Sequence, residues 1–321
     1  MSHEFSVGFS VREPAWHGLA TIVGDYPGRE EGMKLAGHDF TVVEKPIEVD
    51  QQTVTGWKAL VRDDQENVLH VMPSSYGVVQ PSTVWDIVDA MFGQDKDQNL
   101  RYETAGVLKG GRIIWVLVKL DEPVYVKGDT SPTLPFGLVS NTYDGSAAVR
   151  ASATSVRVIC WNTYSMSMFE SARTNREFSF RHTANIMEHI ADAKLAIQGI
   201  RQQHLEFIEL AQELVRQTVS EGGMTYFVNR LIPMPEEALV SERVKANIDH
   251  ARQSVWGVLN GGVTVDPAVR NTAYGLLQAG VEYVDHLRPH RNRETYFGRT
   301  MLRPERVKAN VVLLAREAAT L

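Results

Sequence analysis

Cys160 is the only cysteine of the chain, and its distance from His182 raises the question of a nucleophilic thiol. A cysteine nucleophile needs a neighbouring base, and His182 is the nearest histidine in the sequence. Cys160 follows Val156, Val158 and Ile159, however, and a cysteine in that setting is usually a small buried side chain. We therefore favour a structural role for Cys160 at the end of a buried strand, and we interpret Asn162 and Thr163 as caps of a following helix.

The other residues that could hold a metal or a phosphate form no recognisable set. His182 and His189 lie seven residues apart without a carboxylate–histidine pattern nearby, and the other histidines are scattered. The stretch GVLKGGR lacks the spacing of a P-loop and the Ser or Thr that would hold magnesium. The sequence therefore predicts no catalytic residues, no metal site and no cofactor.

The distribution of charge points to a different chemistry. The net charge is −6, yet residues 1–100 hold 7 Lys and Arg against 16 Asp and Glu, so the excess acid lies in the first third. The segment 288–308 is rich in arginine. A solvated surface is the plainer explanation of such charge runs, and the alternative is an anionic partner.

A second group of cations lies around the middle of the chain and forms our candidate site. We predict that these residues bind nucleic acid: Lys109, Arg112, Arg150, Arg157, Trp161, Arg176 and Arg181. Arginine and lysine would contact phosphates, and Trp161 could stack on bases, although a tryptophan is more often part of a core.

The elements that must position these residues are predicted to be hairpins up to about residue 160. The runs TVTGWKALV and NVLHVM flank the turn RDDQE, and the turns at 109–111 and 144–145 each separate two apolar runs. Between them, YGVVQPSTVWDIVDAMFG predicts a short strand and then a helix capped by Ser82 or Thr83.

The strand that contains Arg150 and Arg157 changes its polarity pattern partway along. Even positions are polar from Arg150 to Thr154 and apolar from Val156 to Cys160, and a strict alternation cannot hold through both halves. We therefore predict a bulge near Thr154, which would bring Arg150 and Arg157 to the same side of the sheet.

Beyond residue 183 the chain is predicted to be helical. Thr183 is a candidate N-cap, and apolar positions from Ile186 to Leu214 follow alternating steps of four and three, as in a heptad seam. Such a helix would be roughly 45 Å long, so we predict that a later helix or a second copy covers it, with a homo-oligomer favoured. Asp266 and Pro267 are predicted to open a later helix.

These patterns predict an α+β fold, in which an antiparallel, hairpin-rich sheet at about residues 50–161 is followed by a long heptad helix and a helical C-terminal region. We divide the chain into a mainly β domain, residues 1–180, and a helical region, residues 181–321, that packs on it. No apolar run approaches the ~20 residues of a membrane helix, and the N-terminus lacks a signal-peptide pattern. We therefore expect a cytoplasmic protein without a membrane partner.

Several strings of the chain resemble a known family. SNTYDGSAAVRASATSVRVICWNTYSMSM and FSFRHTANIMEHIADAKLAI, together with AWHGLA and NTAYGLLQAGVEYVDH, are similar to the phage- and plasmid-borne family named domain of unknown function 932. Arg157, Cys160 and Asn162 fit its strand-end string, whereas Tyr143 stands where histidine is common. The resemblance covers most of the chain.

The resemblance implies a protein of mobile elements, with a proposed link to the single-strand annealing proteins of phages and plasmids. Those proteins pack a hairpin-rich sheet against a long helix and assemble into rings that hold single-stranded DNA. On this basis we expect single-stranded DNA binding and annealing in recombination, without a catalytic site and in the host cytoplasm.

Two other classes of function stay open. One is a phage assembly protein, or a decoy or inhibitor that binds a host protein, for which the basic surface would be incidental. The other is a nucleotide-directed enzyme with Asp144, Cys160 and His182 close together. A salt-dependent shift with a labelled single-stranded oligonucleotide distinguishes the DNA-binding hypothesis from the protein-binding one.

Overall fold

The structure is a computed structural model, and it describes residues 5–11, 20–93, 101–120, 123–157, 162–165, 178–180, 190–235, 241–261, 265–289 and 306–321. It combines two sheets with helices, which confirms the predicted α+β class. None of the described helices is long and apolar enough to span a bilayer.

The larger sheet, sheet A, forms the centre of the molecule and has nine strands among the described residues. Its main path runs in the order β11 (Asn162–Ser165), β10 (Val149–Arg157), β9 (Pro132–Thr142), β7 (Ile113–Lys119), β6 (Arg101–Leu108), β1 (Phe5–Val11) and β2 (Thr21–Val23). Two short strands, β12 (Phe178–Phe180) and β8 (Val124–Tyr125), pair with β10 and β9. β1 pairs antiparallel with β6 but parallel with β2, so sheet A as a whole is mixed. The strands within residues 50–161, where an antiparallel sheet was predicted, pair antiparallel.

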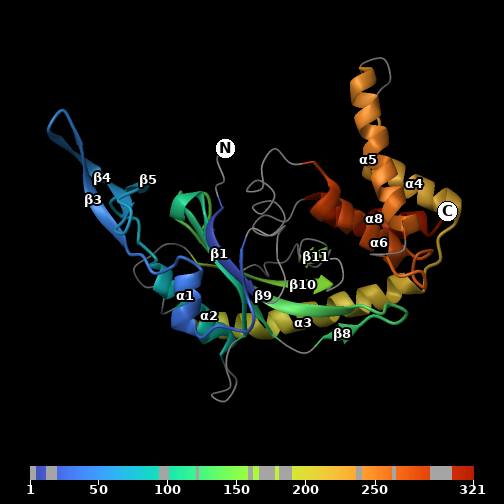
Figure 1. The fold of residues 1–321 in the computed structure, drawn as a ribbon, viewed down its shortest axis with the longest axis horizontal. Coiled ribbons are helices and arrows are strands. Elements are labelled where there is room, and N and C mark those ends of the chain that lie inside the picture. The colour runs from blue at the N-terminus through green and yellow to red at the C-terminus, as the bar shows by residue number, and fades with distance from the viewer. Residues whose placement is uncertain are drawn as a thin grey trace.

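The smaller sheet, sheet B, is antiparallel and has the order β3 (Val42–Val49), β4 (Gln52–Arg62) and β5 (Val68–Pro73). The predicted hairpin around RDDQE is therefore confirmed as β4 and β5. The β3–β4 hairpin projects from the body of the molecule, as Figure 1 shows at the left. Its turn residues Asp50 and Gln51 have φ values of 50° and 65°, as a two-residue hairpin turn requires.

Helices cover one face of sheet A. α1 (Arg29–Leu35) lies over β1 and β6, α2 (Pro81–Phe92) lies over β7 and β9, and α3 (Ile190–Val215) lies beside α2 and against β10 (Figure 1). The buried side of α2 meets buried residues of sheets A and B in one of the two main cores, whose members include Val84, Ile87, Met91, Val116 and Val139. This core needs a 3.6-residue period in α2 and a two-residue period in the strands, and the sequence provides both.

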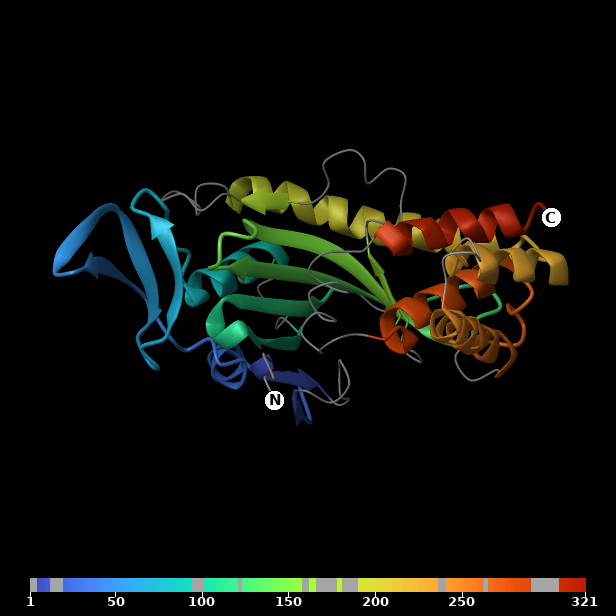
Figure 2. The same ribbon diagram turned by 90° about the horizontal axis from the view of Figure 1, so that it is seen from above.

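A second core lies at the other end of the molecule. It is formed by α4 (Glu221–Leu231), α5 (Glu242–Gly261), α6 (Ala273–Glu282), the π-helical turn η7 (Tyr283–Leu287) and α8 (Arg306–Ala318), together with the C-terminal half of α3. Figure 2 shows α3 running from the layer over sheet A into this helical cluster. Val126, from the loop between β8 and β9, is buried in the same core. The helical cluster and sheet A are therefore joined by both α3 and this loop.

The long helix is described over 26 residues, and only its C-terminal half can be compared with the predicted seam. Four predicted seam positions, His204, Phe207, Ala211 and Leu214, are buried there, and the last three belong to the helical core of the same chain. The predicted N-cap Thr183 and the seam position Ile186 lie outside the described residues. The full heptad seam stays a prediction, and so does the two-domain division at residue 180.

The structure corrects the predicted bulge in β10. Its pairing with β9 runs without interruption from Arg150↔Ser140 to Arg157↔Thr133. Without a bulge, positions 150 and 157 are seven residues apart and lie on opposite faces of the sheet. The prediction was wrong because β9 is buried on both faces, and a strand inside such a sheet does not need one polar face.

Two predicted helix starts were also wrong. α2 begins at Pro81 after Gln80, and the side-chain cap predicted at Ser82 or Thr83 is absent. A proline at the first helical position lacks the N–H that would otherwise need a partner there. Asp266 opens a turn, and α6 begins after Thr272, whose hydroxyl accepts a hydrogen bond from the Gly275 amide.

Asn162 belongs to strand β11 and not to a helix cap, because the backbone of 162–165 pairs with β10. Likewise, the short strand predicted before α2 is not formed, since residues 76–80 have no regular structure. Local capping patterns cannot reveal such pairings, which join backbone groups of separate segments.

His38 is a fully buried histidine with partners on both ring nitrogens. The Trp85 indole N–H donates to Nδ1 at 2.9 Å, and Nε2 lies 2.8 Å from the Gly106 carbonyl oxygen. Because indole can only donate, Nδ1 is the acceptor and the ring proton is on Nε2. Burial lowers the pKa of His38 to about 4 against the raising effect of the hydrogen bond to Gly106, and the charge of Arg62 contributes to the lowering. The ring is therefore neutral in the folded protein at pH 7.

This shift predicts a pH dependence of stability. Between about pH 6.5 and pH 4 the unfolded chain binds a proton at His38 that the folded chain does not, so stability falls as pH falls, by up to about 1.4 kcal/mol per pH unit. Urea unfolding of the parent and of His38→Gln at pH 7, 6 and 5 measures this contribution. We expect the variant to be less stable at pH 7 and the gap to narrow toward pH 5; a constant gap would contradict the prediction.

Candidate nucleic-acid interface

Two turns at one end of sheet A carry the first of the predicted cations. The β6–β7 turn contains the 3-10 element η2 (Lys109–Gly111), and the β9–β10 turn spans residues 143–148. Antiparallel pairing of β7 with β9 places both turns at the same end, which we call the hairpin end. Lys109, Gly110 and Gly111 all have positive φ, with values of 55°, 63° and 110°. The predicted turn at 109–111 is thus confirmed.

Sheet B holds the β6–β7 turn in place. A Cβ atom at Gly111 would lie 2.7 Å from the Cδ atom of Arg62, so the arginine side chain packs directly on the glycine. Arg62 in turn donates two hydrogen bonds to the Asp64 carboxylate and stacks over the Phe40 ring, with 3.9 Å from Cζ to the ring centroid. Arg62 therefore positions the turn, and the Asp64 carboxylate balances its charge.

Arg112 follows this turn and presents an exposed side chain. Its carbonyl oxygen accepts a hydrogen bond of 2.7 Å from the Tyr143 amide, which ties the β6–β7 turn to the β9–β10 turn. Its guanidinium makes no hydrogen bond or ion pair with any residue that the structure describes. The backbone of Arg112 is thus fixed while its charged group stays available to a ligand.

Arg150 lies near the same end, on β10. It pairs with Ser140 of β9, which pairs with Trp115 of β7, so a row of three residues crosses three strands. Strand spacing and rise place Arg112 and Arg150 about 14 Å apart between Cα atoms. Arg150 is half-buried, whereas Lys109 and Arg112 are exposed. The structure therefore brings Lys109, Arg112 and Arg150 to one end of sheet A.

Arg157 is not part of this group. It ends β10 seven residues after Arg150, which is about 23 Å along the strand. It pairs with Thr133, at the end of sheet A that adjoins the helical cluster. Trp161, Arg176 and Arg181 lie outside the described residues, so their place relative to the hairpin end stays a prediction. Among the described residues, the candidate interface therefore consists of Lys109, Arg112 and Arg150.

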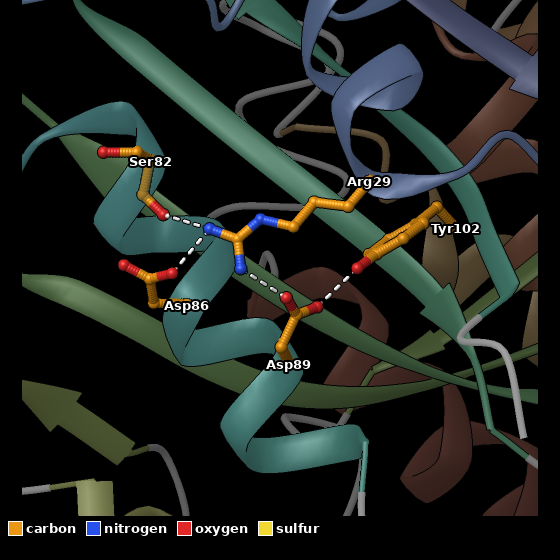
Figure 3. Close-up of polar contacts among 5 residues, drawn as sticks. All are labelled: Arg29, Ser82, Asp86, Asp89 and Tyr102. Carbon is orange, nitrogen blue, oxygen red and sulfur yellow. Dashed lines mark hydrogen bonds and ion pairs between the residues drawn. The ribbon is translucent and has the colours of Figure 1, made fainter. Parts of the chain in front are cut away.

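Sequence reasoning missed a polar cluster on the helical face of sheet A, drawn in Figure 3. Arg29 of α1 forms ion pairs of 2.5 Å with both Asp86 and Asp89 of α2, and it also donates to the Ser82 carbonyl oxygen. Asp89 accepts a further hydrogen bond from the Tyr102 hydroxyl of β6. The spacing of Asp86 and Asp89, three residues apart on one helix, was the available sequence signal.

This cluster has a structural role, because its contacts hold three elements together. Burial raises the pKa of Tyr102, and its hydrogen bond to Asp89 and the charge of that carboxylate raise it further. The phenol therefore stays a proton donor at neutral pH, and Asp89 stays engaged by both Tyr102 and Arg29. Such a group joins α1, α2 and β6.

The described residues hold no cluster of histidine, cysteine and carboxylate side chains that could ligate a metal ion. A family model described as domain of unknown function (DUF932) matches residues 68–314, well over half of the chain. No curated protein and no solved structure matches the chain.

Proposed function

The chain belongs to the family defined by the domain of unknown function DUF932, and from this premise we propose that it binds single-stranded DNA. In this proposal the protein serves DNA metabolism of a phage or plasmid, as an annealing factor in recombination. It holds the strand through phosphate contacts and has no catalytic site.

The observation that carries the proposal is the exposed guanidinium of Arg112. It stands on a turn that is fixed by Arg62 and by the Tyr143 amide, it has no described ion-pair partner, and Lys109 and Arg150 lie at the same end of sheet A. An exposed guanidinium without a described partner, such as that of Arg112, can replace a counterion of a phosphate backbone, which favours binding independent of base sequence. The arrangement therefore supports contact with the backbone and not readout of bases.

The fold supports the proposal in outline, because an antiparallel hairpin region packs against the long helix α3. Assembly into a homo-oligomer is part of the same proposal. The C-terminal half of α3 is covered by its own chain, since Phe207, Ala211 and Leu214 lie in the helical core. A second copy would therefore contact other surfaces than this half of the predicted seam.

The binding test uses a fluorescein-labelled single-stranded oligonucleotide and fluorescence anisotropy over a range of salt concentrations. We expect the parent to bind at low salt and Arg112→Ala to weaken binding about threefold to tenfold, equally for oligonucleotides of different sequence. Loss of one phosphate contact should also reduce the slope of log K against log salt by about 0.7. Arg150→Ala should act in the same direction.

The matched control is Arg243→Ala, which removes an exposed arginine on α5, in the helical cluster at the other end of the molecule. We expect this variant to bind DNA as the parent does. The proposal fails if the parent binds no oligonucleotide at low salt, or if Arg112→Ala and Arg243→Ala have equal effects. In that case the protein-binding alternative takes its place.

A further inference from the structure

Sheet B carries an open strand edge along β5. In the described part of the chain, β5 pairs only with β4, and β3 pairs only with β4, so the sheet has two edges. The Ser74 amide donates to the Gly56 carbonyl oxygen, and the antiparallel alternation from this bond turns the peptide groups of Val71 away from β4. Val71 therefore offers a backbone N–H and a backbone C=O at the outer edge of β5.

The two edges differ in how they are protected. β3 contains Pro46 and the charged residues Glu44, Lys45 and Glu48, and its first backbone groups are bound by the Gln80 side chain at Val42. Proline and charge on an edge strand discourage pairing with another chain. β5, with the sequence VLHVMP, has no Lys, Arg, Asp or Glu, and its single proline is the last residue. Of the two sheet B edges formed by the described residues, β5 is therefore the one open to strand addition.

An apolar surface borders the open edge. Val68 is 54% exposed and Val71 is 43% exposed on β5, and Trp57, paired with Pro73, is 49% exposed on β4. Lys45, Ala59 and Val71 form one row across the three strands, so Val71 is on the face of sheet B that the main core does not cover. A strand added beside β5 would bury its own apolar side chains against this surface.

The charge around the edge determines which partner strand would bind beside β5. Residues 42–73 contain six carboxylates, at positions 44, 48, 50, 63, 64 and 66, against three cations. Two of these cations are already paired, Lys58 with Glu44 and Arg62 with Asp64. The turn 63–66 precedes β5, and Glu48 and Asp50 lie beyond its other end on the β3–β4 hairpin. The turn at the start of β5 is therefore acidic, and the β3–β4 hairpin that extends past its other end carries two further carboxylates.

We propose that the β5 edge of sheet B binds an extended, basic segment of a partner protein by adding it as a fourth strand. Backbone hydrogen bonds to Val71 would supply the pairing, the apolar surface at Val68, Val71 and Trp57 would receive alternate side chains, and the flanking carboxylates would attract lysine or arginine. Nucleic acid is disfavoured because the surface is acidic, and a second sheet B is disfavoured because the two acidic copies would repel.

The test uses the full chain and a fluorescein-labelled eight-residue peptide of alternating lysine and valine, with anisotropy as the readout. We expect saturable binding, at least tenfold weaker binding of the matching glutamate–valine peptide, and weaker binding at high salt. Val71→Pro removes the outward N–H without removing a bond to β4, and we expect it to weaken lysine–valine binding at least tenfold. Val71→Thr keeps that N–H and should stay within threefold of the parent.

A second measurement leaves the protein unchanged and so does not depend on the folding of Val71→Pro. The lysine–valine peptide N-methylated at its valines cannot donate along one edge, and strand addition predicts at least a tenfold loss of affinity. Equal binding of the methylated and unmethylated peptides, or equal binding of the acidic and basic peptides, would overturn the proposal. Dimerisation of the parent that Val71→Pro abolishes, with no peptide binding, would assign the edge to a second copy instead.

Discussion

Gly223→Ala is expected to destabilise the protein by about 2–4 kcal/mol, because two helices touch at this residue. Gly223 lies in the first turn of α4, and a Cβ atom added to it would lie 2.2 Å from the carbonyl oxygen of Ala318 in α8. That oxygen is a backbone atom and cannot rotate aside, so α4 and α8 would have to separate. Thermal or urea unfolding of the full chain measures the loss.

The adjacent residue gives a matched control for this prediction. Gly222 is in the same turn of α4, but its added Cβ atom would meet only the Ser220 hydroxyl oxygen at 3.6 Å, an ordinary contact. Alanine is a better helix former than glycine, so Gly222→Ala should leave stability unchanged or raise it by up to about 1 kcal/mol. If both variants lose the same stability, helix contact at Gly223 is not the cause.

Asp129→Ala is expected to cost about 3 kcal/mol, because the buried carboxylate of Asp129 joins the loop between β8 and β9 to α6. One carboxylate oxygen accepts from the Ser131 amide at 3.0 Å, and the other accepts from the Tyr274 hydroxyl at 3.1 Å and the Gln278 side-chain amide at 2.8 Å. Alanine would leave these donors without this acceptor inside the helical core. Urea unfolding, monitored by circular dichroism, measures the change.

Asp266 provides the comparison at the same junction. It accepts hydrogen bonds from Thr130 and from the Ala268 amide, but it is only half-buried, so water can replace it. We expect Asp266→Ala to cost about 1 kcal/mol. Equal losses for the two variants would show that burial of Asp129 does not set the strength of the junction.

Local sequence patterns predict one part of the candidate site and not the other. The positive φ values of the 109–111 turn and the nearby position of Arg112 follow from local chemistry, since glycines between two apolar runs favour a hairpin. The separation of Arg157 from Arg150 does not follow in that way. The register of β10 is set by backbone pairing with β9, and a change of polarity along one strand carried no information about that partner.

The sequence by itself determined the local elements: the hairpins β4–β5, β6–β7 and β9–β10, and the amphipathic face of α2. Each depends on residues close together in the chain, through turn conformation and side-chain period. The tertiary structure alone decided the pairing of β1 with β6, where Ser10 meets Thr104, and the parallel step to β2. It also decided that β5 is an edge strand, because a strand becomes an edge only when no distant segment pairs with it. Contacts between remote segments are selected by the burial of the whole core, and no short pattern records that selection.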